Sequence, residues 1–153
     1  MIKLNEKDIN TLKQSEHYEK NRGYLLEDVG EHAGLWTLKI RTGKKWDYDG
    51  ITTDGQKAQI KLGSGGQIAS NCYKEYIQEG MSDIFIIGVK HRKDMLLYYF
   101  TKDGLLQYLE DYKEGIKKKD GKYRLNISTR KGSLQALNKN SYNTVRIQNY
   151  PHY

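Results

Sequence analysis

Cysteine, proline and long apolar runs are almost or wholly missing from this sequence. Cys72 is the only cysteine among 153 residues, which excludes an internal disulfide framework and a zinc site built on several cysteines. No apolar run approaches the roughly 20 residues that a membrane-spanning helix requires. The first ten residues are too polar for a secretory signal peptide, so we expect a cytoplasmic protein that makes no membrane contact.

Length and composition indicate one folded domain. Hydrophobic residues make up 37% of the chain and charged residues 29%, which is enough apolar side chain for a buried core beneath a polar surface. The sequence shows no internal repeat and no segment with the composition of a linker between domains. We therefore expect residues 1–153 to form a single domain.

Positive charge is concentrated in the C-terminal quarter. The chain holds 26 Lys and Arg against 19 Asp and Glu, a formal net charge of +7. Residues 113–153 alone hold ten basic and two acidic residues, which leaves a balance of −1 for the rest. Tyrosines and side-chain amides are interspersed with these charges, a mixture typical of nucleic-acid binding. The alternative is that Lys117, Lys118 and Lys119 form a solvated turn and that the excess charge serves solubility.

Hydrophobic spacing predicts an α/β protein. We expect helices over residues 5–20, with Asn5 as the N-cap, over residues 23–33, ended by Gly34, over residues 67–79, and from Thr101 to about residue 112. We expect strands over residues 35–41, 82–89, 95–100 and 122–127, a hairpin over residues 46–62, and mixed polar structure in the rest of the tail. Gly63–Gly66 precedes no Gly-Lys-Ser/Thr, so a nucleotide-binding P-loop is not expected.

The hairpin over residues 46–62 has a register that its loop length fixes. A three-residue loop of Thr53, Asp54 and Gly55 places Gly55 in the left-handed region that glycine favours. Ile51 then faces Lys57, Asp49 faces Gln59 and Asp47 faces Lys61, while Ala58, Ile60 and Leu62 form the opposite, apolar side. A two-residue loop would instead set Asp49 opposite Ile60.

Two carboxylates, a carboxamide and a lysine would thus share one side of this hairpin. Hard oxygen ligands of this kind bind Mg²⁺, which activates water and polarises a phosphodiester. A nearby lysine stabilises the negative charge of the transition state or positions the attacking water. The bland alternative is that these are ordinary solvated residues paired across strands.

The order of helix with Glu27, strand, Asp49 in a hairpin strand, Gln59-Ile60-Lys61 in the next, then helix and strand resembles the PD-(D/E)XK nuclease superfamily. The resemblance covers residues 22–112, the expected catalytic core, between an N-terminal helical arm (1–21) and a basic DNA-contacting extension (113–153). It implies a restriction-endonuclease-like fold, with a mixed central sheet flanked by helices. The sequence departs from the family pattern at Tyr48, where the family has proline, and at Gln59, where it has an acid.

The resemblance also implies roles for single residues. Asp49 would be the principal metal ligand, Gln59 a second ligand and Lys61 the catalytic lysine. Glu27 would be the acid from the first core helix, with Glu31 or Asp47 as alternatives. Because Gln59 carries no charge, metal binding would be weaker unless one of these acids compensates.

The function implied is a Mg²⁺-dependent DNA endonuclease, with Mn²⁺ as a possible substitute, that leaves a 5′-phosphate and a 3′-hydroxyl. We expect cleavage of double-stranded DNA at a specific sequence by a homodimer without a nucleotide cofactor. A junction resolvase and a noncatalytic DNA-binding protein that has kept the fold are the alternatives. The residues expected to contact DNA are Lys44, Lys45, Lys57, Ser64, Gln67, Arg130, Lys131, Lys139 and Arg146.

Overall fold

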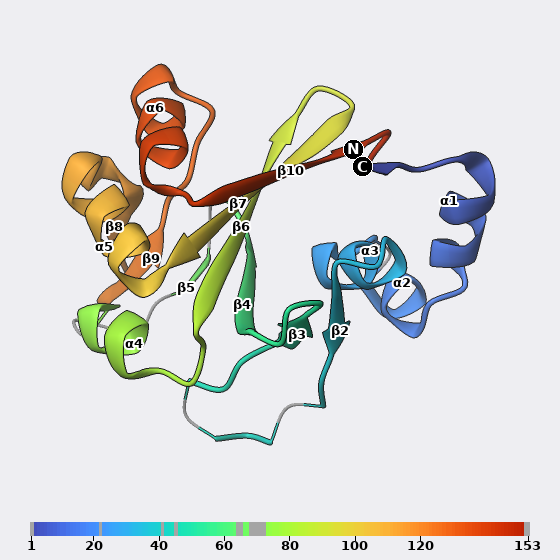
Figure 1. The fold of residues 1–153 in the computed structure, drawn as a ribbon, viewed down its shortest axis with the longest axis horizontal. Helices are drawn as coiled ribbons and strands as arrows, with labels where there is room; N and C mark the ends of the chain where they lie inside the picture. The colour runs from blue at the N-terminus through green and yellow to red at the C-terminus, as the bar shows by residue number, and fades with distance from the viewer. Residues whose placement is uncertain are drawn as a thin grey trace.

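A computed structural model describes residues 2–21, 23–40, 42–44, 46–63, 66, 67 and 73–151 (Figure 1). Its strands are β1 (Ile2–Lys3), β2 (Trp36–Leu38), β3 (Gly50–Thr52), β4 (Lys57–Leu62), β5 (Gly66–Gln67), β6 (Ile84–His91), β7 (Asp94–Thr101), β8 (Ile116–Lys119), β9 (Lys122–Leu125) and β10 (Asn143–Gln148). Its helices are α1 (Glu6–Lys13), α2 (Glu16–Asn21), α3 (Leu26–His32), α4 (Tyr73–Glu79), α5 (Lys102–Asp111) and α6 (Lys131–Asn140), with a 3₁₀ turn at Lys113–Gly115.

The main sheet has seven strands in the order β1-β10-β7-β6-β4-β3-β2. Strands β2, β3 and β4 run antiparallel, as do β6, β7 and β10. Strand β4 pairs with β6 in parallel, and α4 lies in the long connection that such a crossover requires. The predicted mixed sheet flanked by helices is therefore confirmed.

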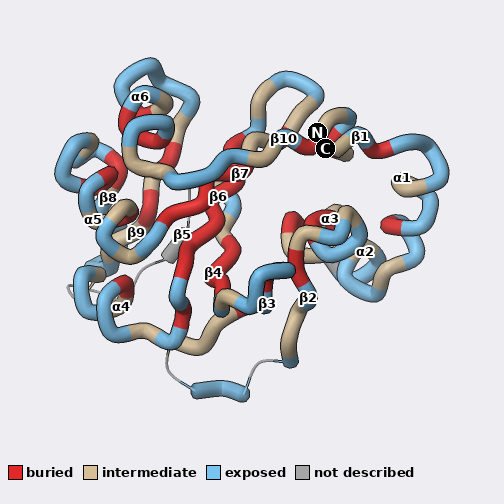
Figure 2. Tube along the Cα trace, in the orientation of Figure 1, coloured by how far each residue is buried: buried red, intermediate tan, exposed pale blue. Residues whose placement is uncertain are grey.

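Apolar side chains of β6 divide the core in two. Ile84 and Ile86 belong to one buried cluster, and Phe85, Ile87 and Val89 to the other. This follows from the two-residue period of a strand whose two faces are both covered. The burial colouring shows this central strand red along most of its length (Figure 2).

A different set of helices covers each face of the sheet. Leu12 of α1, and Leu26 and Val29 of α3, pack into the cluster of Ile84 and Ile86. The second cluster holds buried side chains of α4, α5 and α6, among them Ile77, Leu105, Tyr108 and Leu137. Figure 1 shows α1–α3 on one side of the strands and α4–α6 on the other, so the fold has three layers.

Local sequence explains where several helices begin and end. Asn5 and Asp8 form a reciprocal capping box at the start of α1, and Thr101 caps α5 through the N–H of Gly104. Helix α3 ends in a Schellman motif, because Gly34 takes φ +80° and the N–H groups of Gly34 and Leu35 donate to Glu31 and Gly30. The helix predicted over residues 5–20 is instead two helices, α1 and α2.

The C-terminal segment differs most from the prediction. Strand β10 lies inside the main sheet between β1 and β7, and Ile147 is fully buried. The predicted boundary separates a core at 22–112 from an extension at 113–153. In the structure, the extension contributes a strand to the interior of the main sheet. Helix α6 and strand β8 also occupy residues expected to be irregular.

A smaller sheet has the order β5-β9-β8. It joins the chain that follows β4 to the basic segment of the tail, since β5 pairs with β9. Gln67 lies in β5, so the helix predicted over residues 67–79 is wrong at its start and right at Tyr73–Glu79. Residues 68–72 of that prediction, Cys72 included, lie outside the described residues. In the described part of the chain, no helix combines the length and apolar character needed to cross a bilayer.

Candidate functional site

The hairpin β3–β4 has the register that its sequence predicts. Gly55 takes φ +84°, and the N–H of Thr52 donates to the carbonyl oxygen of Gln56 at 2.9 Å. Ile51 pairs with Lys57, as a three-residue loop requires. Ala58 and Ile60 are buried as predicted, whereas Leu62 is 40% exposed, because it lies at the end of its strand.

A bulge at Asp49 interrupts this register. Gly50 is the ladder partner of Ala58, yet the N–H of Asp49 also donates to the carbonyl oxygen of Ala58 at 2.9 Å. Two residues of one strand thus oppose one residue of the other, which is a β-bulge. Bulges redirect the side chains beside them, and this one lies at the residue predicted to be the principal metal ligand.

Asp49 and Gln59 are joined directly. The Gln59 side-chain amide nitrogen donates to Asp49 Oδ2 at 2.9 Å, and the backbone N–H of Ile60 donates to the same oxygen at 2.8 Å. Asp49 is 6% exposed and Gln59 5% exposed. A buried carboxylate needs such donors, and these two fix its orientation.

Glu27 approaches Asp49 from helix α3. Both residues line one surface hollow, which we call the Glu27 hollow, together with His17, Leu25, Glu31, Leu38, Lys39 and Ile40. The indole Nε1 of Trp36 donates to the backbone carbonyl oxygen of Glu27 at 2.9 Å, which ties α3 to β2. Glu31 is engaged elsewhere, since its Oε2 accepts from the N–H of Leu38 at 2.7 Å. Glu27 and Glu31 both line the hollow with Asp49, so both acids of this helix are candidate ligands.

Lys61 and Gln59 line a second hollow. We call it the Lys61 hollow; it is also lined by Gly43, Lys44, Trp46, Asp47 and Tyr76. Lys61 is half-buried, and its Nζ lies 5.7 Å from the centre of the Tyr76 ring on α4. Such a cation–π contact holds the ammonium group at the wall of the hollow.

Asp47 lines the same hollow as Lys61 but is not its partner in the ladder. Its Oδ2 accepts from Lys39 Nζ at 2.8 Å and from the N–H of Thr42 at 2.9 Å, while Oδ1 accepts from the N–H of Tyr48. The bulge at Asp49 breaks the alternation of sides, so the residues before it leave the ladder. The hydrogen bond from Lys39 and that from the Thr42 backbone hold the pKa of Asp47 well below its usual value.

The oxygen donors of the site suit a hard cation. Asp49 and Glu27 supply carboxylate oxygens from one hollow, and Gln59 supplies an amide oxygen once its nitrogen faces Asp49. Among the described residues, no group of three or more His, Cys, Asp and Glu side chains is arranged to hold a metal ion. Asp49 and Glu27 are the acids that would hold Mg²⁺ at this hollow, with the amide oxygen of Gln59 and water as further ligands.

The residues predicted to contact DNA lie in several places. Lys44 is exposed between β2 and β3, Lys57 is exposed with its Nζ 5.5 Å from the Tyr48 ring, and Lys131 is exposed at the start of α6. Arg130, Lys139 and Arg146 pair with Glu114, Asp111 and Asp94, respectively. Lys45 and Ser64 lie outside the described residues, and the side chain of Gln67 is not described.

Two residues of the Glu27 hollow, His17 and Lys39, were not predicted from the sequence. His17 is exposed, and its ring Nδ1 forms a hydrogen bond of 2.9 Å with Asp28 Oδ2. Lys39 lies at the end of β2 and holds Asp47. No spacing rule finds either residue, because the arm that carries His17 meets α3 through tertiary packing alone.

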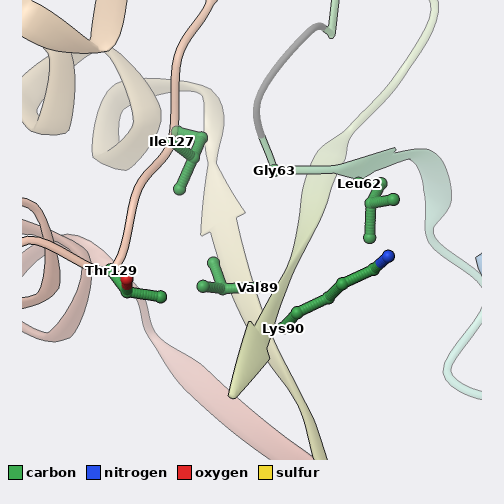
Figure 3. Close-up of a pocket in the computed structure, with 6 residues that line it drawn as sticks. All are labelled: Leu62, Gly63, Val89, Lys90, Ile127 and Thr129. Atoms are coloured by element: carbon green, nitrogen blue, oxygen red, sulfur yellow. The ribbon is translucent and has the colours of Figure 1, made fainter. Parts of the chain in front are cut away.

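A third hollow adjoins the exit of β4 (Figure 3). Leu62, Gly63, Val89, Lys90, Ile127 and Thr129 line it. Figure 3 shows Val89 pointing toward Ile127 and Thr129, while Lys90 extends to the opposite side, near Leu62. A Cβ on Gly63 would lie 3.0 Å from the Gly88 carbonyl oxygen and 3.3 Å from Ile127 Cβ, so the chain leaves β4 in close contact with the tail.

No protein-family model matches this chain, and no curated protein matches it.

Proposed function

We propose that this protein is a Mg²⁺-dependent DNA endonuclease of the restriction-endonuclease-like type. The observation that carries the proposal is the buried hydrogen bond between Asp49 and Gln59, at 2.9 Å, on neighbouring chain segments with Lys61 two residues further along β4. This is the arrangement that the resemblance to the PD-(D/E)XK superfamily implies.

The order of elements around the site supports the proposal. Helix α3 carries Glu27, β2 follows it, Asp49 directly precedes β3, β4 carries Gln59 and Lys61, and α4 and β6 come next. The strands β2, β3, β4 and β6 are neighbours in the sheet in a continuous run. A chain with this order brings an acid from a helix to the end of the hairpin, as the Glu27 hollow does.

Asp49, Glu27 and the amide oxygen of Gln59 would hold the cation. Bound Mg²⁺ supplies charge that polarises the scissile phosphate and lowers the pKa of a water molecule. The donors from Gln59 and Ile60 keep the Asp49 carboxylate in one orientation, so little reorganisation accompanies binding.

Lys61 would act on the phosphate from the second hollow. Its ammonium group neutralises negative charge that grows on the phosphate oxygens, or donates a hydrogen bond that positions the attacking water. The ring of Tyr76 limits where this group can move. A homodimer would bring two such sites to the two strands of a duplex.

A noncatalytic DNA-binding protein is the second candidate. Gln59 favours this candidate. Its amide nitrogen donates a hydrogen bond to the Asp49 carboxylate, and this bond partly stabilises the negative charge that a metal ion would otherwise stabilise.

Cleavage assays separate the two candidates. Wild type, Asp49→Asn and Lys61→Ala would be incubated with supercoiled, linear and four-way-junction DNA, in Mg²⁺, in Mn²⁺ and in EDTA. We expect metal-dependent cutting by the wild type and a loss of at least about a hundredfold in both variants. The preferred substrate distinguishes sequence-specific cleavage from junction resolution. A wild type that binds all three substrates and cuts none would make the protein a DNA-binding protein instead.

A further inference from the structure

The hairpin β8–β9 carries a row of positive charge that the proposed site does not use. Its turn is Asp120–Gly121, in which both residues take positive φ, 54° and 75°, as a two-residue hairpin turn requires. The ladder pairs Lys117 with Arg124 and Lys119 with Lys122. Because paired residues project to the same side of a ladder, these four cations share one face, which we call the basic face.

The opposite face of the hairpin belongs to the core. Leu125 pairs with Ile116 on that side and is 3% exposed. Tyr123 is also on that side, and its ring packs against Tyr73, with ring centroids 6.0 Å apart. The basic face therefore looks outward, and Lys117, Lys119 and Lys122 are all exposed.

Like charges opposite each other on neighbouring strands oppose the folding of a hairpin. Among the described residues, no ion pair joins these four cations to an acid: Glu114 pairs with Arg130 and Asp111 with Lys139, and Asp120 lies in the hairpin turn itself. Within the described part of the chain, the buried Nε of Arg124 has no hydrogen-bond partner. Three exposed lysines and Arg124 on one short face suit a polyanionic ligand.

A groove continues the basic face along the tail. It is lined by Lys113, Lys117, Asn126, Ser128 and Arg130, with Glu114 and Ile116. Asn126, Ser128 and Arg130 follow Arg124 at the two-residue spacing of extended chain. Residues 113–130 hold seven basic residues and two acids, a balance of +5 within a chain of net charge +7.

We propose that the basic face and this groove bind the phosphate backbone of duplex DNA. The inference rests on the proposed function for the choice of DNA as the ligand. The face offers ammonium, guanidinium, amide and hydroxyl donors, which suit phosphate oxygens. Single strands are held on stacking platforms, whereas Tyr123 lies on the opposite face of the hairpin against Tyr73, so the basic face suits a duplex rather than a single strand.

Salt-dependent binding in EDTA tests this proposal without any cleavage. The hairpin variant is Lys117→Gln, Lys119→Gln and Lys122→Gln together. Its control is Lys7→Gln, Lys13→Gln and Lys20→Gln, three exposed lysines of α1 and α2 that give the same net charge. Fluorescence anisotropy would follow a labelled duplex of about 20 base pairs between about 50 and 200 mM salt.

We expect the hairpin variant to bind roughly tenfold more weakly or worse at the lowest salt, with a plot of log affinity against log salt shallower by about 2 to 3. The control should keep the slope and affinity of the wild type, and all three proteins should melt cooperatively. Equal losses in both variants, no loss in the hairpin variant, or tighter binding of single strands or RNA would each overturn the proposal. Failure of metal-dependent cleavage with hairpin-dependent binding intact would overturn the proposed function alone.

Discussion

Around Asp49 the charged groups are buried and bonded within the chain, whereas on the hairpin β8–β9 the lysines are exposed and face other cations. Asp49 accepts from Gln59 and Ile60, and Asp47 accepts from Lys39, Thr42 and Tyr48. On the hairpin, Lys117 faces Arg124 and Lys119 faces Lys122.

The contrast distinguishes a region that holds chemical groups in fixed positions from a region that attracts a charged ligand. A site that performs chemistry on a phosphate must hold its groups in place before the substrate arrives, so the fold itself supplies their partners. On a surface that binds a polyanion, the ligand supplies the opposite charges. The binding free energy then comes largely from the release of counterions. Substitutions around Asp49 should therefore impair stability or cleavage, whereas substitutions on the hairpin β8–β9 should impair DNA binding.

The largest effect is expected when Asp49 is removed. Asp49→Ala leaves the Gln59 amide and the Ile60 N–H buried without an acceptor, at a cost of about 1 to 3 kcal/mol for each donor. Asp49→Asn is the matched control, because it keeps an oxygen acceptor and removes only the charge. Urea denaturation should show a large loss of unfolding free energy for alanine and a smaller one for asparagine. Equal stability of wild type and Asp49→Ala would contradict the buried hydrogen bonds.

A smaller loss is expected at Gly30, which holds α3 and Glu27 in place. A Cβ built on Gly30 lies 1.8 Å from Trp36 Cζ2, so Gly30→Ala must displace the indole that donates to Glu27. Overpacking of this kind costs about 1 to 3 kcal/mol. Thermal melting would measure the loss, and DNA binding in EDTA should stay at the wild-type level, since the basic face is on the other side of the sheet. Gly132→Ala, in the exposed first turn of α6, controls for the loss of a glycine elsewhere, because its Cβ would meet only the Tyr112 ring at an ordinary 3.5 Å.

The ion pair of Asp47 predicts a pH dependence of stability. Hydrogen bonds from Lys39 and Thr42 lower the pKa of Asp47 in the folded state below the usual 3.8. The unfolded state then binds the proton first, so this stabilisation is complete above about pH 4 to 5 and is lost as the pH falls toward the folded-state pKa. Asp47→Asn should be less stable than wild type near neutral pH, and the gap should narrow in acid. A gap that stays constant from neutral pH to about pH 3 would show that Asp47 holds no such pair.

The smallest effect expected is a gain of stability. Lys119→Glu turns the like-charge pair with Lys122 into an opposite-charge pair, which should stabilise the hairpin by about 0.2 to 1 kcal/mol. Lys118→Glu, opposite Tyr123, is the control and should show no such gain. The same Lys119→Glu protein should bind DNA more weakly, and a variant that gains stability without losing affinity would separate the charge repulsion from binding.

Local signals in the sequence predicted the part of the site that depends on one turn. Gly55 and the loop length placed Ile51 opposite Lys57, and from there Asp49 beside Gln59. The bulge at Asp49 has no such signal, because it depends on Asp49 pairing with Ala58 on one side and with Lys39 on the other. Asp47 therefore lies outside the ladder, although it lines the same hollow as Lys61.

Tertiary pairing explains what the sequence did not predict in the fold. Strands β6 and β7 are continuous apolar runs and were found, since both of their faces are buried. Strand β10 contains exposed Asn143, Thr144 and Arg146, and its place in the sheet comes from β7, more than 40 residues earlier in the chain. The burial of Ile147 can be understood only once β7 is known to be the neighbour of β10.

Cutting and binding measured on the same three proteins test the division between the two regions most directly. Wild type, Lys61→Ala and the hairpin variant would be assayed for DNA cleavage in Mg²⁺ and for duplex binding in EDTA. The account predicts that Lys61→Ala binds like the wild type and does not cut, while the hairpin variant binds weakly and regains cutting when DNA is raised to saturation. Loss of binding in Lys61→Ala together with unchanged binding in the hairpin variant would contradict it.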